Sequence, residues 1–317
     1  MATRRAKRPR LADTTGSMLT RLAVSKSEHR NRELSAATLQ RALFALESAG
    51  AVVLEQVVMP EHLAALDQRM TEDWARSYQR LSFNYSEGHQ QLNPPRTTEL
   101  VFSDVVANPF VEQIARGYVG VEGSEGGTAS EMAYLGAYSG NCNCSGSDDQ
   151  PVHSDIGHSE PQLTCRSLIC NVPTVDVSEA NGAIELLLET HALCGLAKSS
   201  KHCERFPDIG HDMVKGREEY APGSFVRVCT RSGDVLLRDR RLWHRGRRNP
   251  SNAPRVMVSL TYFPGVSGET DKPIRCLTFE DGCRPAFEES SFSRRLDFKE
   301  TFDHLSPAMI SASSLTN

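Results

Sequence analysis

Six short runs of apolar, β-branched and aromatic residues follow one another along the second half of this chain. Glycine, asparagine, serine and proline separate them, so each run is bounded by residues that favour turns. Runs of this length and spacing are typical of antiparallel sheets packed face to face, as in a jelly roll. We therefore predict a mainly β core with strands at residues 132–138, 168–172, 183–188, 225–228, 235–237 and 256–263.

The part of the chain before these runs shows helical periodicity. Three leucines recur at helical spacing between Ser35, a suitable N-cap, and Gly50, a suitable residue just after a helix end. The apolar run 51–54 predicts a strand, and Pro60 suits the first turn of a second amphipathic helix. We expect these helices to flank the sheet.

Three residues in the strand region have side chains that bind transition metals. His153 and Asp155 lie two residues apart in the segment QPVHSDIGH, and on an extended strand such residues point to the same side. His244 follows the apolar run 235–237. Two histidines and one carboxylate are the ligands of the facial triad that holds non-haem Fe(II) and leaves positions open for other ligands. A His-x-Asp pair alone is common by chance, so this interpretation needs support from the rest of the chain.

Arg255 supplies that support. It lies eleven residues after His244 and directly before the apolar run 256–263. A guanidinium pairs with a carboxylate through two parallel hydrogen bonds, which a lysine cannot reproduce, so Arg255 is a candidate for gripping a dicarboxylate co-substrate. The alternative is an arginine paired with an aspartate or glutamate at a sheet edge.

Two segments, QPVHSDIGH and GDVLLRDRRLWHRGRRNPSNAPRVMVSLTYFP, carry a resemblance to a known family. Their residue types and spacing resemble the phytanoyl-CoA dioxygenase family of Fe(II)/2-oxoglutarate-dependent oxygenases, from about Ala51 to Gly265. The family fold is a double-stranded β-helix, a cupin-like jelly roll with flanking α-helices. The resemblance implies Fe(II) bound by His153, Asp155 and His244, with 2-oxoglutarate and O2 as co-substrates.

The same resemblance implies contacts to 2-oxoglutarate. Arg255 would bind its distal carboxylate. Gln150, three residues before the first metal histidine, and Thr190, near the end of the segment NGAIELLLETH, would be auxiliary contacts. A Leu-Glu pair stands where the family usually has Pro-Gly before this hydroxyl residue, so the local turn departs from the family pattern.

The resemblance implies an enzyme that oxidises a C–H bond of a small organic metabolite. Hydroxylation is the usual outcome in the family, desaturation or cyclisation are related outcomes, and natural-product biosynthesis is our leading interpretation. Family members that halogenate have a small residue in place of the metal carboxylate, so Asp155 indicates oxygenation. Three alternatives stay open: a fatty acyl-CoA hydroxylase, a cupin-type metalloenzyme that works without 2-oxoglutarate, and a non-catalytic binding protein on the same barrel.

Length and composition fit one oxygenase domain at residues 31–317. Residues 1–30 are basic and polar with little apolar surface, which predicts a disordered tail. Within the domain we expect a mostly helical buttress at 31–130, the jelly-roll core at 131–265 and a C-terminal extension at 266–317.

Two long polar segments, 81–98 and 199–223, are expected to cover the mouth of the barrel as lids. In the extension, Phe298, Phe302 and Leu305 lie at helical spacing. They predict a helix that docks on the core or pairs two subunits, so a homodimer is one expectation.

Charge and composition limit the kinds of binding partner that we expect for this chain. The formal net charge is −4, which gives no general attraction to nucleic acid or to anionic membranes. The chain has no apolar run of transmembrane length and no signal-peptide core. Its nine cysteines suit free thiols in a reducing compartment better than a disulfide framework. We expect an intracellular, cytoplasmic protein that takes a small-molecule substrate, with no nucleic-acid or membrane partner.

Overall fold

A seven-stranded sheet forms the centre of the computed structural model, which describes residues 18–120, 133–155, 166–192, 225–264, 277–290, 292 and 296–300. Neighbouring strands are antiparallel, except for the outermost pair β1 and β2, which is parallel. In spatial order the strands are β1 (Thr20–Ala23), β2 (Ala51–Glu55), β8 (Val235–Asp239), β5 (Leu168–Pro173), β10 (Arg255–Pro264), β4 (Ala133–Asn143) and β3 (His89–Gln91).

A smaller sheet lies across from the large one. It contains β7 (Val226–Arg227), β6 (Glu185–Leu187) and β9 (Trp243–Arg245), and a further antiparallel bridge joins His153 to His244 of β9. Side chains from both sheets line one cavity. This arrangement of two sheets around a shared interior agrees with the predicted jelly roll.

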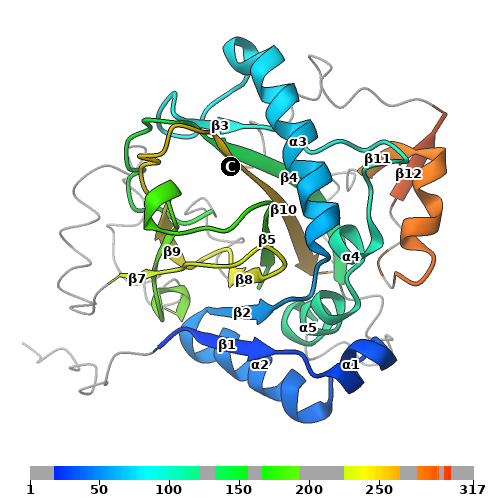
Figure 1. The fold of residues 1–317 in the computed structure, drawn as a ribbon. Helices are drawn as coiled ribbons and strands as arrows, with labels where there is room; N and C mark the ends of the chain where they lie inside the picture. Colours follow the sequence, from blue (N-terminus) through cyan, green and yellow to red (C-terminus); the bar gives the residue numbers. More distant parts are fainter. Residues whose placement is uncertain are drawn as a thin grey trace, which may run out of the picture.

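Helices cover the outer face of the large sheet. Figure 1 shows α3 crossing in front of β10 and β4, and α2 running beside β1. Their apolar residues join those of the sheet in one buried core, as expected for amphipathic helices packed on a sheet. The helices are α1 (Lys26–Asn31), α2 (Ala36–Ala49), α3 (Pro60–Ser77), α4 (Ser103–Val106) and α5 (Pro109–Val119).

Strand β10 separates this core from the cavity, because its side chains alternate between the two faces of the sheet. One set is fully buried in the core beneath the helices: Val256, Val258, Leu260 and Tyr262. The other set lines the cavity: Arg255, Met257, Ser259, Thr261 and Phe263.

The structure confirms the local predictions for the helical part. The Ser35 side chain accepts a hydrogen bond from the Thr38 amide at the start of α2, and Gly50 ends the helix with a φ of 81°. Helix α3 begins at Pro60. Five of the six predicted strands keep their approximate bounds, and β4 extends beyond its predicted end to Asn143.

The predicted tail of residues 1–30 is too long. Strand β1 pairs with β2, and its residue Leu22 is buried. Arg21 forms ion pairs with Glu55 and Asp234. This segment lacks a core of its own, and it becomes ordered because it adds a strand to the edge of an existing sheet.

Two further predictions differ from the structure. The segment 81–98 contains β3, whose polar residues His89 and Gln90 are buried against β4, so it is part of the sheet as well as a connection. Phe298 lies in β12 (Leu296–Lys299), which pairs with β11 (Leu277–Glu280), and not in a helix, whereas Phe302 and Leu305 of the same prediction lie outside the described residues. The predicted lid 199–223 lies outside the described residues.

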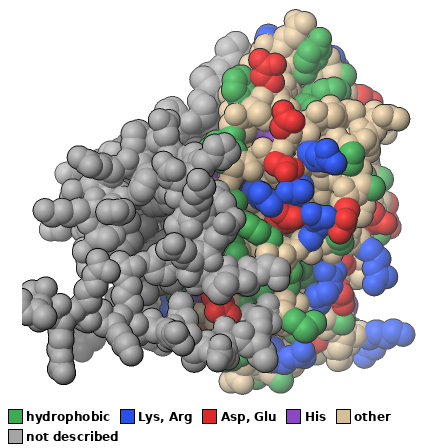
Figure 2. Space-filling view, turned by 90° about the vertical axis from the view of Figure 1, so that its left-hand side faces the viewer, with side chains coloured by type: hydrophobic (Ala, Val, Ile, Leu, Met, Phe, Trp, Pro, Cys, Tyr) green, Lys and Arg blue, Asp and Glu red, His purple; other side chains and the backbone are tan. Residues whose placement is uncertain are grey.

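Two properties of the described residues concern the molecule as a whole: the distribution of charged side chains on the surface and the character of the helices. On the face shown in Figure 2, basic and acidic side chains are intermixed over the part that is coloured by type. Among the described helices, none combines the length and the apolar character that crossing a membrane requires.

Candidate metal centre

The two histidines of the predicted triad face each other across an antiparallel bridge. The His153 amide donates to the His244 carbonyl at 2.9 Å, and the His244 amide donates to the His153 carbonyl at 2.9 Å. Residues that exchange both hydrogen bonds in this way have their side chains on the same face of the pair. The two imidazole centroids lie 4.3 Å apart.

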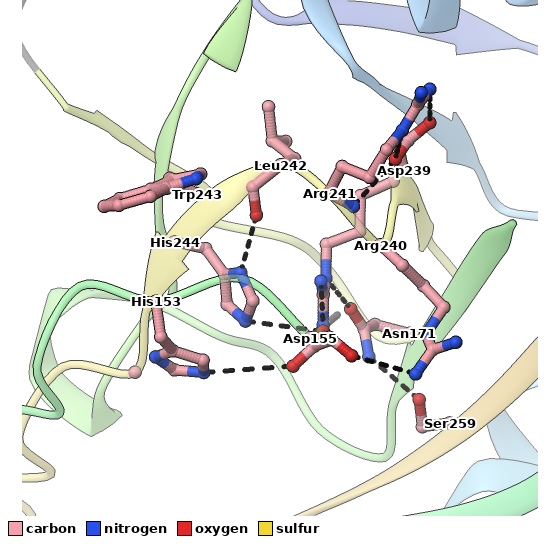
Figure 3. A network of polar contacts seen from close by, with 12 residues as sticks. His153, Asp155, Asn171, Asp239, Arg240, Arg241, Leu242, Trp243, His244 and Ser259 are labelled. Carbon is pink, nitrogen blue, oxygen red and sulfur yellow. Dashed lines mark hydrogen bonds and ion pairs between the residues drawn. The ribbon is translucent and has the colours of Figure 1, made fainter. Parts of the chain in front are cut away.

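Asp155, two residues after His153 in the chain, is the third member of this cluster. Its Oδ1 lies 3.9 Å from Nε2 of His153, and its Oδ2 lies 3.6 Å from Nε2 of His244. One potential ligand atom from each of the three residues lies within 4.8 Å of the others. Figure 3 shows the three side chains converging from the segment 153–155 and from β9.

Backbone carbonyls fix the orientation of both imidazoles. Nδ1 of His153 lies 2.8 Å from the Pro151 carbonyl, and Nδ1 of His244 lies 2.9 Å from the Leu242 carbonyl. Because a carbonyl only accepts hydrogen bonds, Nδ1 carries the proton in each ring. The unprotonated Nε2 atoms therefore point toward the shared space, as metal-binding histidines require.

The protonation states also suit a cation. Burial lowers the pKa of His153 and of His244, so both rings are neutral at neutral pH. Burial alone would raise the pKa of Asp155, but the neighbouring Arg238 and the two histidines lower it well below its usual range. Two neutral imidazoles and one carboxylate form the donor set that binds Fe(II) in facial-triad sites.

Arg255 lies at one end of the cavity that these residues share. Its guanidinium donates from Nε to the Asn181 carbonyl at 3.0 Å and from Nη2 to the Gly182 carbonyl at 3.2 Å. Carbonyls orient a guanidinium without neutralising its charge. Within the described part of the chain no carboxylate pairs with Arg255, so the alternative of an ion pair at a sheet edge does not hold there.

The cavity lining also includes Phe263 and two further arginines, Arg238 and Arg240. Arg255 and Phe263 are the first and ninth residues of β10, so this wall is about 26 Å long at ~3.3 Å per residue. The guanidinium carbon of Arg240 lies 5.0 Å from the Phe263 ring centroid. The three triad residues line the same cavity.

A family model described as phytanoyl-CoA dioxygenase (PhyH) matches residues 46–257, which include all three triad residues and Arg255. The chain belongs to the phytanoyl-CoA dioxygenase family. It is therefore an Fe(II)/2-oxoglutarate-dependent enzyme, with Fe(II), 2-oxoglutarate and O2 as its cofactor and co-substrates.

Solved structures with a similar fold include enzymes of nogalamycin biosynthesis. The α-ketoglutarate-dependent epimerase SnoN, in complex with Fe3+, α-ketoglutarate and nogalamycin RO, is 17% identical, with a TM-score of 0.52 over 72% of this chain and 84% of SnoN. The α-ketoglutarate-dependent carbocyclase SnoK is 17% identical, with a TM-score of 0.51 over 73% of this chain and 84% of SnoK. At this level of identity the likeness is one of fold.

In this PhyH-family chain, Gln150 joins the triad segment to β9. Its amide donates to the Gly246 carbonyl at 2.8 Å, and its Oε1 accepts from the Gly246 amide at 2.8 Å. A Cβ at Gly246 would lie 2.6 Å from Oε1 of Gln150, so a larger residue there would require this side chain to shift. Gln150 lines the cavity, and its side-chain oxygen is already engaged.

Thr190 is not among the residues that line the cavity, and its contact with 2-oxoglutarate stays a prediction. Its hydroxyl donates to the Leu187 carbonyl at 2.7 Å and accepts from the Trp243 amide at 2.9 Å. The side chain is buried between β6 and β9. The departure from the family Pro-Gly turn precedes this residue, and Glu189 there has a φ of 69°.

Sequence reasoning missed the role of Arg238 and Arg240 beside Asp155. Arg238 Nη1 lies 2.6 Å from Asp155 Oδ2, and Arg240 Nη2 donates to the Asp155 carbonyl at 2.8 Å. A signal was present, because Arg238 interrupts an apolar strand at a position that is buried in this structure. It also missed Tyr85, whose ring lies 4.5 Å from that of His153.

Proposed function

We propose that this PhyH-family enzyme oxidises a C–H bond of a small, polar organic molecule. The observation that carries the proposal is the buried cation of Arg255, which has no carboxylate partner within the described residues, in the same cavity as the three metal-binding side chains. We assign His153, Asp155 and His244 as the ligands of Fe(II). When bound, iron together with 2-oxoglutarate activates O2 for the oxidation of a C–H bond.

The residues around the metal site have separate tasks in this proposal. The Asn181 and Gly182 carbonyls orient the Arg255 guanidinium, which then binds the distal carboxylate of 2-oxoglutarate through charge-assisted hydrogen bonds. Gln150 holds the segment that carries His153 against β9, and its amide group faces the same cavity. Arg255 thereby sets the end of the co-substrate site, and substrate is left with the Phe263 end.

The lining of the cavity supports a substrate with hydrogen-bonding groups. Side-chain amides and hydroxyls point into it from β4, β5 and β10. A long acyl chain would leave the polar groups that have no partner in the described part of the chain without hydrogen bonds, which makes a fatty acyl substrate less favourable. These polar lining residues include Gln91, Ser139, Asn141 and Thr261.

The solved relatives support a small-molecule role in natural-product biosynthesis. SnoN is bound to nogalamycin RO, and SnoN and SnoK are described as an epimerase and a carbocyclase. The fold therefore accommodates outcomes other than hydroxylation. Desaturation and cyclisation accordingly stay within the proposal, and the position of the substrate relative to the metal decides among them.

We expect Arg255→Gln to raise the dissociation constant for 2-oxoglutarate at least about tenfold, because hydrogen bonds to a charged group contribute about 1.5–3 kcal/mol. The measurement is an anaerobic titration of the Fe(II)-loaded protein with 2-oxoglutarate, followed through the metal-to-ligand charge-transfer band. Arg248→Gln, which changes an exposed arginine of the preceding loop, is the matched control.

Two results would favour the alternatives. Unchanged 2-oxoglutarate affinity in Arg255→Gln would favour a cupin-type enzyme whose chemistry does not use this co-substrate. Failure of the wild-type protein to bind Fe(II) would indicate a non-catalytic binding protein. Succinate production in the presence of candidate metabolites then identifies the substrate class.

A further inference from the structure

The carboxylate of Asp155 is held by an arginine from the opposite sheet. Nη1 of Arg238, on β8, lies 2.6 Å from Oδ2 of Asp155. The side chains are 7% and 20% exposed, so little water competes for this contact. Figure 3 shows the Asp155 carboxylate between the two histidines on one side and the polar groups of the large sheet on the other.

Arg238 is itself fixed by a chain of hydrogen bonds across three adjacent strands. Its Nε donates to Oδ1 of Asn171 on β5 at 3.0 Å. Nδ2 of Asn171 donates to Oγ of Ser259 on β10 at 3.2 Å. Because the guanidinium is planar and is held at Nε, the position of its Nη1, which forms the ion pair with Asp155, is restricted.

The backbone of Asp155 is held independently of this contact. Its amide donates to the Arg240 carbonyl at 3.0 Å, and its carbonyl accepts from Nη2 of Arg240 at 2.8 Å. With the backbone fixed, the remaining freedom is rotation of the carboxylate about the side-chain bonds. The contact with Arg238 restricts that rotation.

We propose that Arg238 is a positioning residue that orients the Asp155 carboxylate toward the metal, and that Asn171 and Ser259 hold Arg238 in place. The inference rests on the proposed metal site. Partners of metal ligands contribute in this way because they fix the direction of the ligand, and their loss typically weakens metal binding by about 10- to 100-fold.

A competing explanation is that Arg238 only neutralises a buried carboxylate. Charge compensation depends on the presence of the cation and little on the hydrogen bond from its Nε to Asn171. Asn171→Ala separates the two explanations, because it keeps the charge of Arg238 and removes its anchor. Arg238→Gln removes both the positive charge and the guanidinium group that contacts Asp155.

The test uses Co(II) as a probe of the full-length protein under anaerobic conditions. We expect Arg238→Gln to raise the Co(II) dissociation constant by about 10- to 100-fold and to alter the visible absorption of bound Co(II). Asn171→Ala should change the same absorption bands and weaken binding by a smaller factor. Arg248→Gln is the control for loss of an arginine, and circular dichroism of the metal-free variants establishes that they are folded.

The outcomes distinguish this inference from the proposed function. If the wild-type protein does not bind Co(II), or if His153→Ala binds it equally well, the proposed metal site is wrong. If wild type binds through His153 but Asn171→Ala has the affinity and the spectrum of wild type, the positioning role is overturned. Wild-type or tighter binding by Arg238→Gln would overturn it as well.

Discussion

Thr190 shows how one hydroxyl can support a metal site without contacting its ligands. The hydroxyl lies between the Leu187 carbonyl at the end of β6 and the Trp243 amide at the start of β9. Trp243 directly precedes His244. Thr190 therefore fixes the strand that presents the second histidine.

We predict that Thr190→Val lowers the free energy of unfolding by about 1–3 kcal/mol, because the substitution removes the acceptor of a buried amide. The affinity for 2-oxoglutarate should change less than about threefold. Urea unfolding and the anaerobic titration measure the two quantities. Thr190→Ser keeps the hydroxyl and is the matched control.

The opposite pattern would restore the family role of this residue. A tenfold loss of 2-oxoglutarate affinity in Thr190→Val, with stability unchanged, would mean that the hydroxyl contacts the co-substrate.

At the level of elements, the C-terminal end of α2 is joined to the segment that follows β6. The Glu189 amide donates to the Ala49 carbonyl at 2.9 Å, and Nε2 of His191 lies 3.0 Å from the Glu47 carbonyl. A Cβ at Gly50 would lie 2.6 Å from Nδ1 of His191, so the helix end and the imidazole fit only with glycine there. His191 thus connects a helix outside the large sheet to the small sheet.

This connection should make stability depend on pH. Burial lowers the pKa of His191, so the unfolded chain binds a proton more readily than the folded one. The contribution of His191 to the free energy of unfolding is therefore fully present above about pH 6.5 and is lost as the pH decreases through that value toward the folded pKa. We predict that His191→Gln reduces this loss, by up to about 1.4 kcal/mol per pH unit in that window.

Denaturant unfolding between pH 7.5 and pH 5 measures the effect. His89, His153 and His244 also have pKa values lowered by burial, so part of the pH dependence should remain in the variant. A slope identical to that of wild type would exclude a contribution from His191.

At the scale of the whole molecule, the metal site connects parts of the chain that are far apart in sequence. His153 and Asp155 lie between β4 and β5, and His244 lies on β9 of the small sheet. Three arginines near His244 form ion pairs within the protein. Arg245 pairs with Glu185, and the other two pairs are Arg241–Asp239 and Arg247–Asp149. Ion pairs within the protein therefore compensate the charges of Arg241, Arg245 and Arg247.

We predict that Co(II) or Fe(II) stabilises the folded protein, because a ligand that binds only the folded state shifts the unfolding equilibrium. At a metal concentration 100 times the dissociation constant, the gain is about 2.7 kcal/mol. Thermal unfolding with metal and with added chelator measures it. His153→Ala should show no gain, and an equal gain in that variant would place the metal elsewhere.

Local signals in the sequence were sufficient for much of the fold. Helix α2 was predictable because its cap Ser35, its leucine periodicity and Gly50 all act within one element. The His-x-Asp spacing likewise defines one side of an extended segment. Strand β3 was missed because its polar residues have low strand propensity and are ordered only by their contact with β4.

Contacts between distant segments account for the rest of the site. Nothing local to Arg238 indicates Asp155 as its partner, since β8 and the segment 153–155 meet only in the folded chain. Thr190 was assigned from a family pattern at a point where this chain departs from that pattern. Its actual partners, the Leu187 carbonyl and the Trp243 amide, depend on the pairing of β6 with β9.

Strand β10 also determines which kinds of genetic change this enzyme can tolerate. Because its side chains alternate, deleting or inserting one residue within the strand would turn the cavity-facing set toward the helices and bring the apolar set into the cavity. A single substitution at Thr261 leaves this alternation intact. New substrate preferences can therefore arise by point mutation along the strand, whereas changes of its length would remove the core and the co-substrate site together.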